Sequence, residues 1–432
     1  MREWEGRTVA WFRLEGGPHR GSIGPVEGDV LSRLVDTAVD SGVPVVGVLS
    51  TSGADVGEGV ASLHAWGRLA RALSRASGTV PVVLVVVGPC VSGPALLLGM
   101  ADVVVMTAHA AAWVSGPRAV RQLTGVEVTH EALGGAGVHA ARSGVAALVA
   151  DDEESALHMA ADALSYLPSN CLEDPPLHWT EDPADRDCPS LAEVVPAEAT
   201  SSYDVRHVLR DVVDDGHLLE LRARYAANVV TAWATVEGRP VGVVANQPSV
   251  LAGTLDIEAS KKAARFVQLC DAFSLPIVTF VDTPGFQPGK DIEWRGMIRH
   301  GAELVHAYAA ATVPRVCVVL RKAYGGAYIV MDSKGMGNDA CFAWPGAELA
   351  VMGAPGAVQI LHGKRVADPA ERTALEADYA ARHCTPEIAA KRGFVDDVIE
   401  PRHTRREVAL ALRGLRTKRE RLPRRRHSNS PL

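Results

Sequence analysis

Aromatic residues are scarce in this chain of 432 residues, at 5% of its composition. Proteins that hold single-stranded nucleic acid stack its bases on aromatic side chains, and a net charge of −7 opposes binding to phosphate backbones. We therefore expect no nucleic-acid partner. The one basic run, at 416–427, is interpreted as a solvated tail or a subunit contact.

Cysteine is sparse as well, and its spacing excludes two kinds of small scaffold. The count of seven is odd and no two cysteines form a CxxC pair, which argues against a disulfide framework and against a zinc ribbon. Reduced, buried thiols are the simplest interpretation, and we expect no metal in this chain. The cysteines are Cys90, Cys171, Cys188, Cys270, Cys317, Cys341 and Cys384.

Membrane and secretion signals are missing too. No apolar run reaches the ~20 residues that a transmembrane helix needs. The first residues, "MREWEGRTVAW", lack the basic and then apolar pattern of a signal peptide. We expect a cytoplasmic protein without a membrane partner.

Side chains arranged for catalysis are also few. The sequence has no P-loop, no Ser-His-Asp pattern and no cluster with metal-ligand spacing. His300 could act as an acid or base and Asp282 could orient a ligand, but a packed or surface histidine and a turn-forming aspartate are the commoner roles. The chemistry is therefore expected to rest on backbone donors and on a cofactor brought from elsewhere.

What the chain does have is an internal repeat. The stretch "GVPVVGVLSTSGADVGEG" from Gly42 resembles "SLPIVTFVDTPGFQPGKD" from Ser274, and "TVPVVLVVVG" from Thr79 resembles "TVPRVCVVLR" from Thr312. Each half therefore reads as strand, glycine turn, helix, strand, glycine turn, helix and strand. Short, continuously apolar strands joined by helices predict an α/β fold with buried, largely parallel sheets.

Two further segments set the organisation of this repeat. A stretch rich in Pro and Asp, 167–199, is interpreted as a surface linker between the halves. The second half then opens on a β-rich layer at 229–256, with strands paired around the turn at Glu237-Gly238.

Each half also carries a turn that suits oxyanion chemistry. In "GPCVSGPALL" the turn is Ser92-Gly93-Pro94, and in "RKAYGGAYIV" the matching turn is Gly325-Gly326-Ala327. Small residues let a ligand approach the backbone, and the first N–H groups of a helix can hold a developing negative charge. Glycine that serves only close packing is the other interpretation of such a turn.

The proline in the first turn leaves two possibilities open, because proline has no N–H. If Ser92 and Gly93 supply the donors, Pro94 is harmless, because proline is tolerated in the first turn of a helix. If the donors follow the second copy, they are Gly93 and residue 94, and one of them is lost.

Long motifs in both halves resemble one known family. They are "VTFVDTPGFQPG", "IRHGAELVHAYAAATVPRVCVVLRKAYGGAYIVM" and "RGFVDDVIEPRHTRREVALALRGLRTKRERLP", with "EALGGAGVHAARSGVAALVADDEESALHMAADALSYLPSN" in the first half. The chain is similar, from about residue 7 to its end, to the carboxyltransferase β subunits of biotin-dependent acyl-CoA carboxylases of the propionyl-CoA and acetyl-CoA type. The resemblance implies two tandem crotonase-like domains: residues 1–185, which would hold acyl-CoA, and residues 186–432, which would receive biotin.

The resemblance also implies a mechanism and an assembly. Biotin arrives on a carrier protein, carboxybiotin releases CO2, the freed biotin nitrogen takes the α-proton of the thioester, and the enolate attacks CO2. Active sites lie between the first half of one subunit and the second half of another, in a hexamer that is a trimer of dimers. A biotin carboxylase subunit and an acyl-CoA substrate are the implied partners, and the hexamer is made of this chain alone or mixed with a paralogue.

Site residues follow from the same resemblance. One oxyanion hole would hold the biotin ureido oxygen and the other the thioester enolate. The implied catalytic residues are Gly326, Ala327, Ser92 and Gly93, and the implied substrate-binding residues are Gly53, Ala54, Pro94, Gly325, Tyr324 and Ile329.

The sequence departs from the family pattern mainly in the first half. The turn reads Ser92-Gly93-Pro94 instead of Gly-Gly-Ala, Asp55 stands where the family has an arginine, and the segment before the first repeat is shorter. In the second half Ile329 replaces the aspartate often found in propionyl-preferring members, which suits a different or longer acyl group.

Three functions remain open at this point. The leading hypothesis is transfer of a carboxyl group from carboxybiotin to the α-carbon of an acyl-CoA or related acyl thioester, with an unusual substrate of secondary metabolism as one candidate. The first alternative is a biotin-independent crotonase-type decarboxylase or hydrolase. The second is a non-catalytic partner that assembles with an active paralogue.

Overall fold

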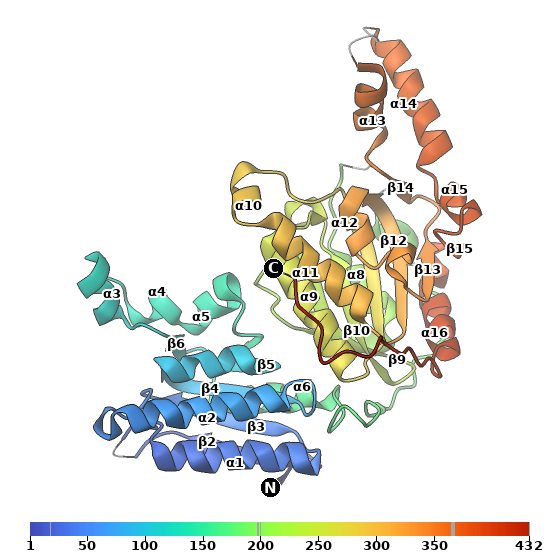
Figure 1. Cartoon of the computed structure of the whole chain (residues 1–432). Coiled ribbons are helices and arrows are strands. Elements are labelled where there is room, and N and C mark those ends of the chain that lie inside the picture. Colours follow the sequence, from blue (N-terminus) through green and yellow to red (C-terminus); the bar gives the residue numbers. More distant parts are fainter. Residues whose placement is uncertain (18, 197, 199, 364–367, 432) are drawn as a thin grey trace. The chain divides into compact units, whose positions relative to one another are not determined.

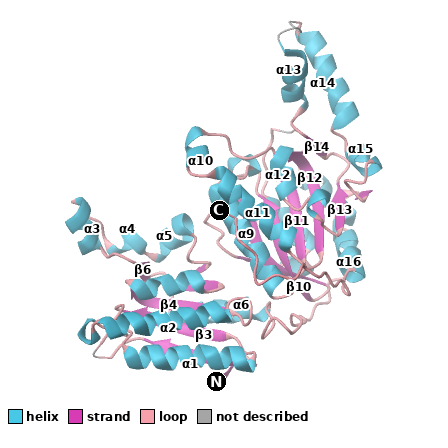
Figure 2. Cartoon of the chain, in the orientation of Figure 1, coloured by secondary structure: helices cyan, strands magenta, loops and turns pink. Residues whose placement is uncertain are grey.

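The structure divides the chain into two compact units. The computed structural model describes residues 1–432 except 18, 197, 199, 364–367 and 432. Unit 1 comprises Met1–Pro176 with Leu221–Tyr225, and unit 2 comprises Leu177–Glu220 with Ala226–Leu432 (Figure 1). Each unit is a β-sheet flanked by helices (Figure 2).

Unit 1 is built on a sheet with the strand order β1-β2-β3-β4-β5-β7, and β6 pairs with the end of β4. All neighbours from β2 onward are parallel, while β1 pairs antiparallel with β2. The central strands are almost continuous runs of valine and leucine because helices bury both faces of a parallel sheet. The strands are β1 (Arg2–Trp4), β2 (Arg7–Leu14), β3 (Val45–Thr51), β4 (Val82–Val91), β5 (Val103–Thr107), β6 (Ala111–Trp113) and β7 (Leu148–Ala150).

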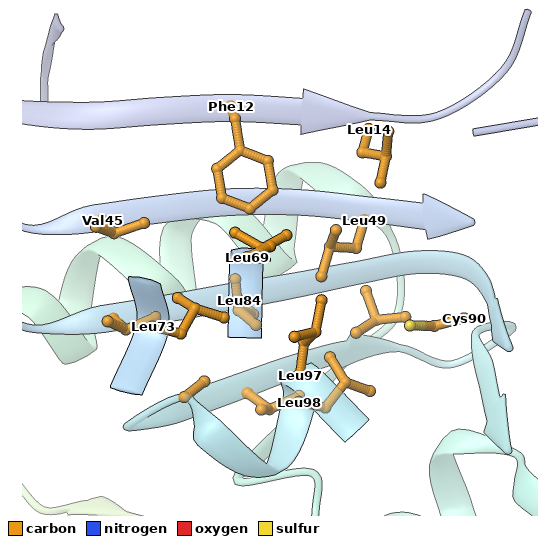
Figure 3. Packing of buried hydrophobic residues seen from close by; sticks show 14 of the residues in the cluster. Phe12, Leu14, Val45, Leu49, Leu69, Leu73, Leu84, Cys90, Leu97 and Leu98 are labelled. Atoms are coloured by element: carbon orange, nitrogen blue, oxygen red, sulfur yellow. The ribbon is translucent and has the colours of Figure 1, made fainter. Parts of the chain in front are cut away.

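Helices α1 and α2 pack closely on one face of this sheet. A Cβ atom on Gly28 of α1 would lie 2.6 Å from the Cβ of Ala65 in α2, so glycine lets the two helices touch. Side chains from β2, β3 and β4 meet α2 and η2 in one apolar cluster (Figure 3). The helices are α1 (Pro25–Ser41), η1 (Val56–Glu58), α2 (Val60–Ala76), η2 (Gly93–Met100), α3 (Pro117–Thr124), α4 (His130–Gly134), α5 (Ala136–Val138), η3 (His139–Ser143) and α6 (Glu153–Ser165).

Unit 2 repeats this plan with the strand order β15-β13-β12-β11-β10-β9-β8, and β14 pairs with the end of β12. Strands β10, β11, β12 and β13 are parallel, and β9 pairs antiparallel with β10. The strands are β8 (Leu219–Glu220), β9 (Val229–Val236), β10 (Arg239–Asn246), β11 (Ile277–Thr283), β12 (Arg315–Tyr324), β13 (Ala340–Ala343), β14 (Glu348–Ala350) and β15 (Asp397–Val398).

Helices cover both faces of the second sheet. Val278 and Phe280 of β11 belong to the apolar cluster that includes α8 and α16. Thr279, between them, must point to the opposite face, where its hydroxyl lies 2.9 Å from that of Tyr308 in α11. The helices are α7 (Leu191–Val194), α8 (Val205–Val212), η4 (Asp214–Gly216), η5 (Leu251–Gly253), α9 (Ile257–Ala272), α10 (Lys290–Trp294), α11 (Met297–Ala310), α12 (Gly325–Val330), η6 (Lys334–Met336), α13 (Ala354–His362), α14 (Pro369–His383), α15 (Pro386–Lys391), η8 (Pro401–His403) and α16 (Thr404–Gly414).

The strands of unit 1 recur in the same order in unit 2, which adds β8 at one edge, and this confirms the α/β fold with an internal repeat. Val45 of β3 faces Val82 of β4, and Ile277 of β11 faces Arg315 of β12 in the same register. The predicted strand pair around Glu237-Gly238 is the β9–β10 hairpin. The surface-linker interpretation is wrong for part of 167–199, because Cys188 and Leu191 are buried in the core of unit 2.

Six of the seven cysteine side chains are buried, as the sequence predicts. All seven cysteines are free thiols, and only Cys171 is not buried. Among the described residues, no helix is long and apolar enough to cross a membrane.

Candidate active site

The turn in unit 2 leads from β12 directly into α12. Gly325 has a φ of +59°, a left-handed conformation that glycine adopts without steric cost. Gly326 and Ala327 follow in the first turn of α12, where helix geometry gives backbone N–H groups no partner within the helix. The turn can therefore offer two adjacent N–H donors, and the helix dipole favours negative charge there.

A cavity of about 520 Å³ opens beside this turn. Gly325, Gly326 and Ile329 line it, and Ile329 is 44% exposed, so its apolar side chain forms part of the accessible wall. The other lining residues are Tyr328, Ser333, Lys334, Gly335, Leu349, Ala350, Val351, Tyr379, His383, Ile388, Ala389, Arg392 and Phe394. Aliphatic and aromatic walls with a few polar groups are typical of a small-molecule site.

Two predicted residues of this turn do not line the cavity. Ala327 has no exposed surface, which leaves only its backbone for a role in binding. The Tyr324 hydroxyl donates a hydrogen bond to the carboxylate of Glu348, and burial together with this carboxylate raises the pKa of Tyr324. Tyr324 therefore supports the turn through its neighbour on β14.

The turn in unit 1 follows a similar path with different donors. The Ser92 N–H donates to the carbonyl of Trp113 on β6 at 2.9 Å. This bond engages the N–H that the predicted role of Ser92 as an oxyanion donor needs. The remaining option is Gly93 with residue 94, and Pro94 has no N–H. Gly93 is then the one backbone donor that this three-residue turn can offer.

Ser92 also adopts a backbone conformation that glycine would fit better. Its φ of +65° and ψ of −152° lie in a region occupied almost only by glycine. Gly325 holds the matching position in unit 2 at a φ of +59°. The first copy therefore has the backbone path of a glycine turn, with a serine in it.

Gly93 and Pro94 are fixed by the side chains around them. A Cβ atom on Gly93 would lie 2.8 Å from Cε2 of Trp66, so the indole ring packs on the bare Cα. Pro94 is buried and borders a small apolar gap with Phe12, Cys90 and Leu97. Cys90 and Leu97 lie at the same end of the cluster in Figure 3.

The loop after β3 lies against the first turn. A Cβ on Gly53 would be 3.0 Å from the Cβ of Ser92, and the φ of Gly53 is +101°. Ala54 forms a β-bridge with Ile23. The structure thus places Gly53 directly beside the turn, as a shared substrate site requires.

Asp55, in place of the family arginine, stabilises its own loop. Its carboxylate accepts the Gly57 N–H at 2.9 Å and caps η1. His19 Nδ1 lies 3.0 Å from the same carboxylate. The substitution therefore adds an N-cap where the family pattern has a cation.

The two side chains that the sequence singled out have structural partners. His300 Nδ1 lies 2.7 Å from Oε1 of Glu303, one helical turn along α11. Asp282 is buried, pairs with the Arg321 guanidinium at 3.1 Å and accepts the Lys322 N–H at 3.1 Å. Burial raises the pKa of Asp282. Neither residue lines the cavity at the second turn.

Two residues that line the cavity could not be predicted from the sequence. Tyr379 and His383 come from α14, more than 50 residues after the turn. No motif or periodicity connects them with Gly325. Within the part of the chain that the structure describes, no three His, Cys, Asp or Glu side chains gather as a metal-binding group.

The doubled fold and its two strand-to-helix turns define a protein of the crotonase-like class. A family model described as the carboxyl transferase domain matches residues 3–430. The carboxyltransferase subunit of propionyl-CoA carboxylase from Haloferax mediterranei is 45% identical over 437 residues, which cover 100% of this chain and 84% of that protein. The chain therefore belongs to the carboxyl transferase family.

Two further comparisons, one of sequence and one of structure, match this chain over most of its length. The methylmalonyl-CoA carboxyltransferase 12S subunit of Propionibacterium freudenreichii subsp. shermanii is 42% identical, over 95% of this chain and 79% of that protein. A crystal structure of transcarboxylase 12S in a hexamer assembly, with methylmalonyl-coenzyme A and methylmalonic acid bound, matches with a TM-score of 0.93 and 42% identity. The match covers 96% of this chain and 80% of that chain.

Proposed function

We propose that this protein is the carboxyltransferase of a biotin-dependent system, which moves a carboxyl group to the α-carbon of an acyl-CoA. Membership of the carboxyl transferase family makes it an acyl-CoA carboxyltransferase by class. The observation that carries the proposal is the intact Gly325-Gly326-Ala327 turn, which opens on an apolar cavity of about 520 Å³.

In unit 2 the proposed chemistry depends on backbone N–H groups. Biotin, carried on a partner protein, would supply the carboxyl group and then a nitrogen base for the α-proton of the substrate. The cavity beside Gly325 and Gly326 suits a compact bicyclic group with an apolar tail. The N–H groups of Gly326 and Ala327 would donate to the ureido oxygen and stabilise charge that develops on it.

In unit 1 the turn would face the thioester of the acyl-CoA. Removal of the α-proton places negative charge on the thioester oxygen, and the Gly93 N–H would donate to it. Ala54 and the backbone of Gly53 would form the surface against which the acyl group lies, whereas the side chain of Pro94 is buried in the core of unit 1. One backbone donor instead of two makes the enolate less stable, so we expect a slower chemical step than the intact turn would give.

The acyl group and the assembly are parts of the same proposal. Ile329 presents an apolar surface to the cavity, which favours an acyl group without a polar or charged end. Residues 1–185 would bind acyl-CoA and residues 186–432 would bind biotin. The hexameric assembly of transcarboxylase 12S supports a hexamer here, and a biotin carboxylase with its carrier would be the partner.

The test is a direct transfer assay. The purified protein is mixed with a carboxylated biotin carrier and a panel of acyl-CoA substrates of increasing length, and carboxylated product is measured by mass spectrometry. We expect product with at least one acyl-CoA, and none after avidin treatment. Conversion of an acyl-CoA to a decarboxylated or hydrolysed product that avidin does not affect would instead establish a biotin-independent decarboxylase or hydrolase.

The altered first turn favours a second candidate function, a non-catalytic subunit of a mixed hexamer. Ser92 engages Trp113 and Pro94 has no N–H, so unit 1 is the part in which an activity would be lost. If the chain alone gives neither product nor decarboxylation of carboxybiotin, but co-purifies with an active paralogue, this second function replaces the first.

A further inference from the structure

A buried ion pair joins the start of β12 to Asp332, two residues after the end of α12, within unit 2. Nη1 of Arg315 is 2.5 Å from Oδ1 of Asp332, and the two side chains are 2% and 0% exposed. The other Nη of Arg315 donates to the carbonyls of Met336 at 3.1 Å and Gly337 at 2.6 Å. One guanidinium at the start of β12 therefore holds both ends of the segment that follows α12.

This segment connects the helix to the wall of the cavity. α12 ends at Val330, and Asp332 follows it with a left-handed φ of +60°. Its carbonyl accepts the side-chain amide of Asn338 at 2.5 Å. The residues immediately after it, Ser333–Gly335, line the cavity. A shift of Asp332 would move α12 and this wall together.

The first copy of the fold lacks this device. Counted from the matching turns, Val82 stands at the position of Arg315 and Gly99 at that of Asp332, and the segment from that point to the next strand is four residues longer in unit 2. These residues cannot form an ion pair. By contrast, both copies keep an aspartate that binds the first N–H of the strand, Asp102 to Val82 and Asp339 to Arg315.

A buried ion pair is poor evidence for stability alone, because desolvation offsets much of the attraction. Its retention beside a site calls for a role in geometry. Oxyanion donors act only when they are held within about 0.5 Å of the productive position. A short helix such as α12, with six residues, has few internal hydrogen bonds with which to hold that position itself.

We propose that Arg315 and Asp332 are positioning residues that hold α12, and with it the N–H groups of Gly326 and Ala327, in place for carboxyl transfer. The role in transfer rests on the proposed function, whereas the mechanical role does not. Arg315 and Asp332 touch no reacting atom, and they act through the backbone of 325–338.

The charge state of the ion pair depends on pH through the carboxyl group of Asp332. Burial raises the pKa of Asp332 to about 6, against the attraction of Arg315. Two other charged groups act on Asp332: Asp339 raises its pKa and Lys418 lowers it. Asp332 in turn raises the pKa of Tyr308. Below about pH 6 Asp332 becomes neutral and the ion pair is lost.

The principal test imports the residues of the first copy. In Arg315→Val/Asp332→Gly, amide hydrogen exchange followed by mass spectrometry should show faster exchange in 325–337, by about 10-fold or more. The kcat for carboxyl transfer should fall by about 10-fold or more, with KM for acyl-CoA within about twofold. Exchange that accelerates equally over the whole of unit 2, or that does not change in 325–337, overturns the proposal.

A second variant keeps the test decisive if the double variant does not fold. Asp332→Asn keeps the shape and removes the charge, so it should resemble the wild type at low pH. The wild-type kcat should fall as the pH drops through about 6, and Asp332→Asn should have a low kcat without that fall. An unchanged pH profile in Asp332→Asn overturns the proposal.

The matched control is Asp214→Asn, which alters another buried aspartate paired with a buried arginine in unit 2. Asp214 lies 2.7 Å from Arg405. This variant should lower the stability of unit 2 and leave exchange in 325–337 and the pH profile unchanged. A wild type without transferase activity would defeat the proposed function, while the exchange experiment would still decide whether the pair holds α12.

Discussion

The turn in unit 1 and the turn in unit 2 have the same origin in the fold but offer different hydrogen-bond donors. The turns follow β4 and β12, whose ends pair with β6 and β14 respectively. The first residue of each turn has a positive φ. In unit 2 these residues are glycine, glycine and alanine, and in unit 1 they are serine, glycine and proline. The comparison shows that a backbone path can be kept while the number of free backbone N–H groups that it offers falls.

The largest effect is expected from moving the proline of unit 1 into unit 2. Ala327→Pro removes one N–H from the intact turn, and proline is tolerated in the first turn of a helix. We expect kcat for carboxyl transfer to fall by about 10²–10³-fold. The transfer assay with carboxylated biotin carrier measures it, and Ala327→Ser, which keeps the N–H, should stay near the wild type. Full activity in Ala327→Pro would show that the Ala327 N–H is not a donor.

The reverse exchange should restore the first turn. Pro94→Ala returns an N–H next to Gly93, and because the Ser92 N–H is engaged by Trp113, we expect kcat to rise by about 10-fold or more. Pro94→Val restores the same N–H but fills a different volume than alanine, so the two variants together distinguish the effect of the N–H from the effect of side-chain packing. If neither variant gains activity, the hole in unit 1 does not limit the reaction.

The packing around the two central glycines differs as well, and a methyl group reports it. Gly93→Ala brings a Cβ within 2.8 Å of Trp66, whereas in Gly326→Ala the nearest neighbouring atom, on Phe286, is 3.5 Å from the new Cβ. We expect Gly93→Ala to destabilise unit 1 by about 1–3 kcal/mol, and Gly326→Ala to change stability by less than about 1 kcal/mol. Denaturant unfolding measures both, and equal losses would remove this distinction.

The smallest effect concerns the strained serine. Ser92→Gly should stabilise unit 1 by about 1 kcal/mol, because glycine accepts the φ of +65° without strain. Gly325→Ser, at a φ of +59°, should cost unit 2 a similar amount. Thermal unfolding of the two variants is the measurement. A destabilised Ser92→Gly would mean that the serine side chain contributes more than its backbone costs.

Much of the fold could be predicted from the sequence because it is written in local patterns. The runs of valine that precede each turn are typical of buried parallel strands, and the repeat of the same order of elements in both halves predicts the two sheets. The Glu237-Gly238 turn was likewise visible between two apolar strands. The boundary segment was predicted less well, since Cys188 and Leu191 are buried by contacts with residues far along the chain.

Site residues that belong to the turn motif could be predicted from the sequence, whereas those that depend on tertiary contacts could not. Gly325, Gly326 and Ile329, which the turn motif singled out, line the cavity. The donor role predicted for Ser92 is opposed by a contact outside the motif, because its N–H donates to the carbonyl of Trp113. Tyr379 and His383 could not be predicted at all, because a helix about 50 residues away reaches the cavity only through the tertiary fold.

The sequence by itself determined the class of the protein, the doubled α/β plan and the position of both turns, because strand composition and glycine placement act over a few residues. Only the tertiary structure decided which donors those turns offer. A backbone N–H is available or engaged according to the strand beside it, as the Ser92 N–H is engaged by the carbonyl of Trp113 on β6. Arg315 and Asp332 are 17 residues apart, and the pair they form exists only where β12 and the segment after α12 are folded together.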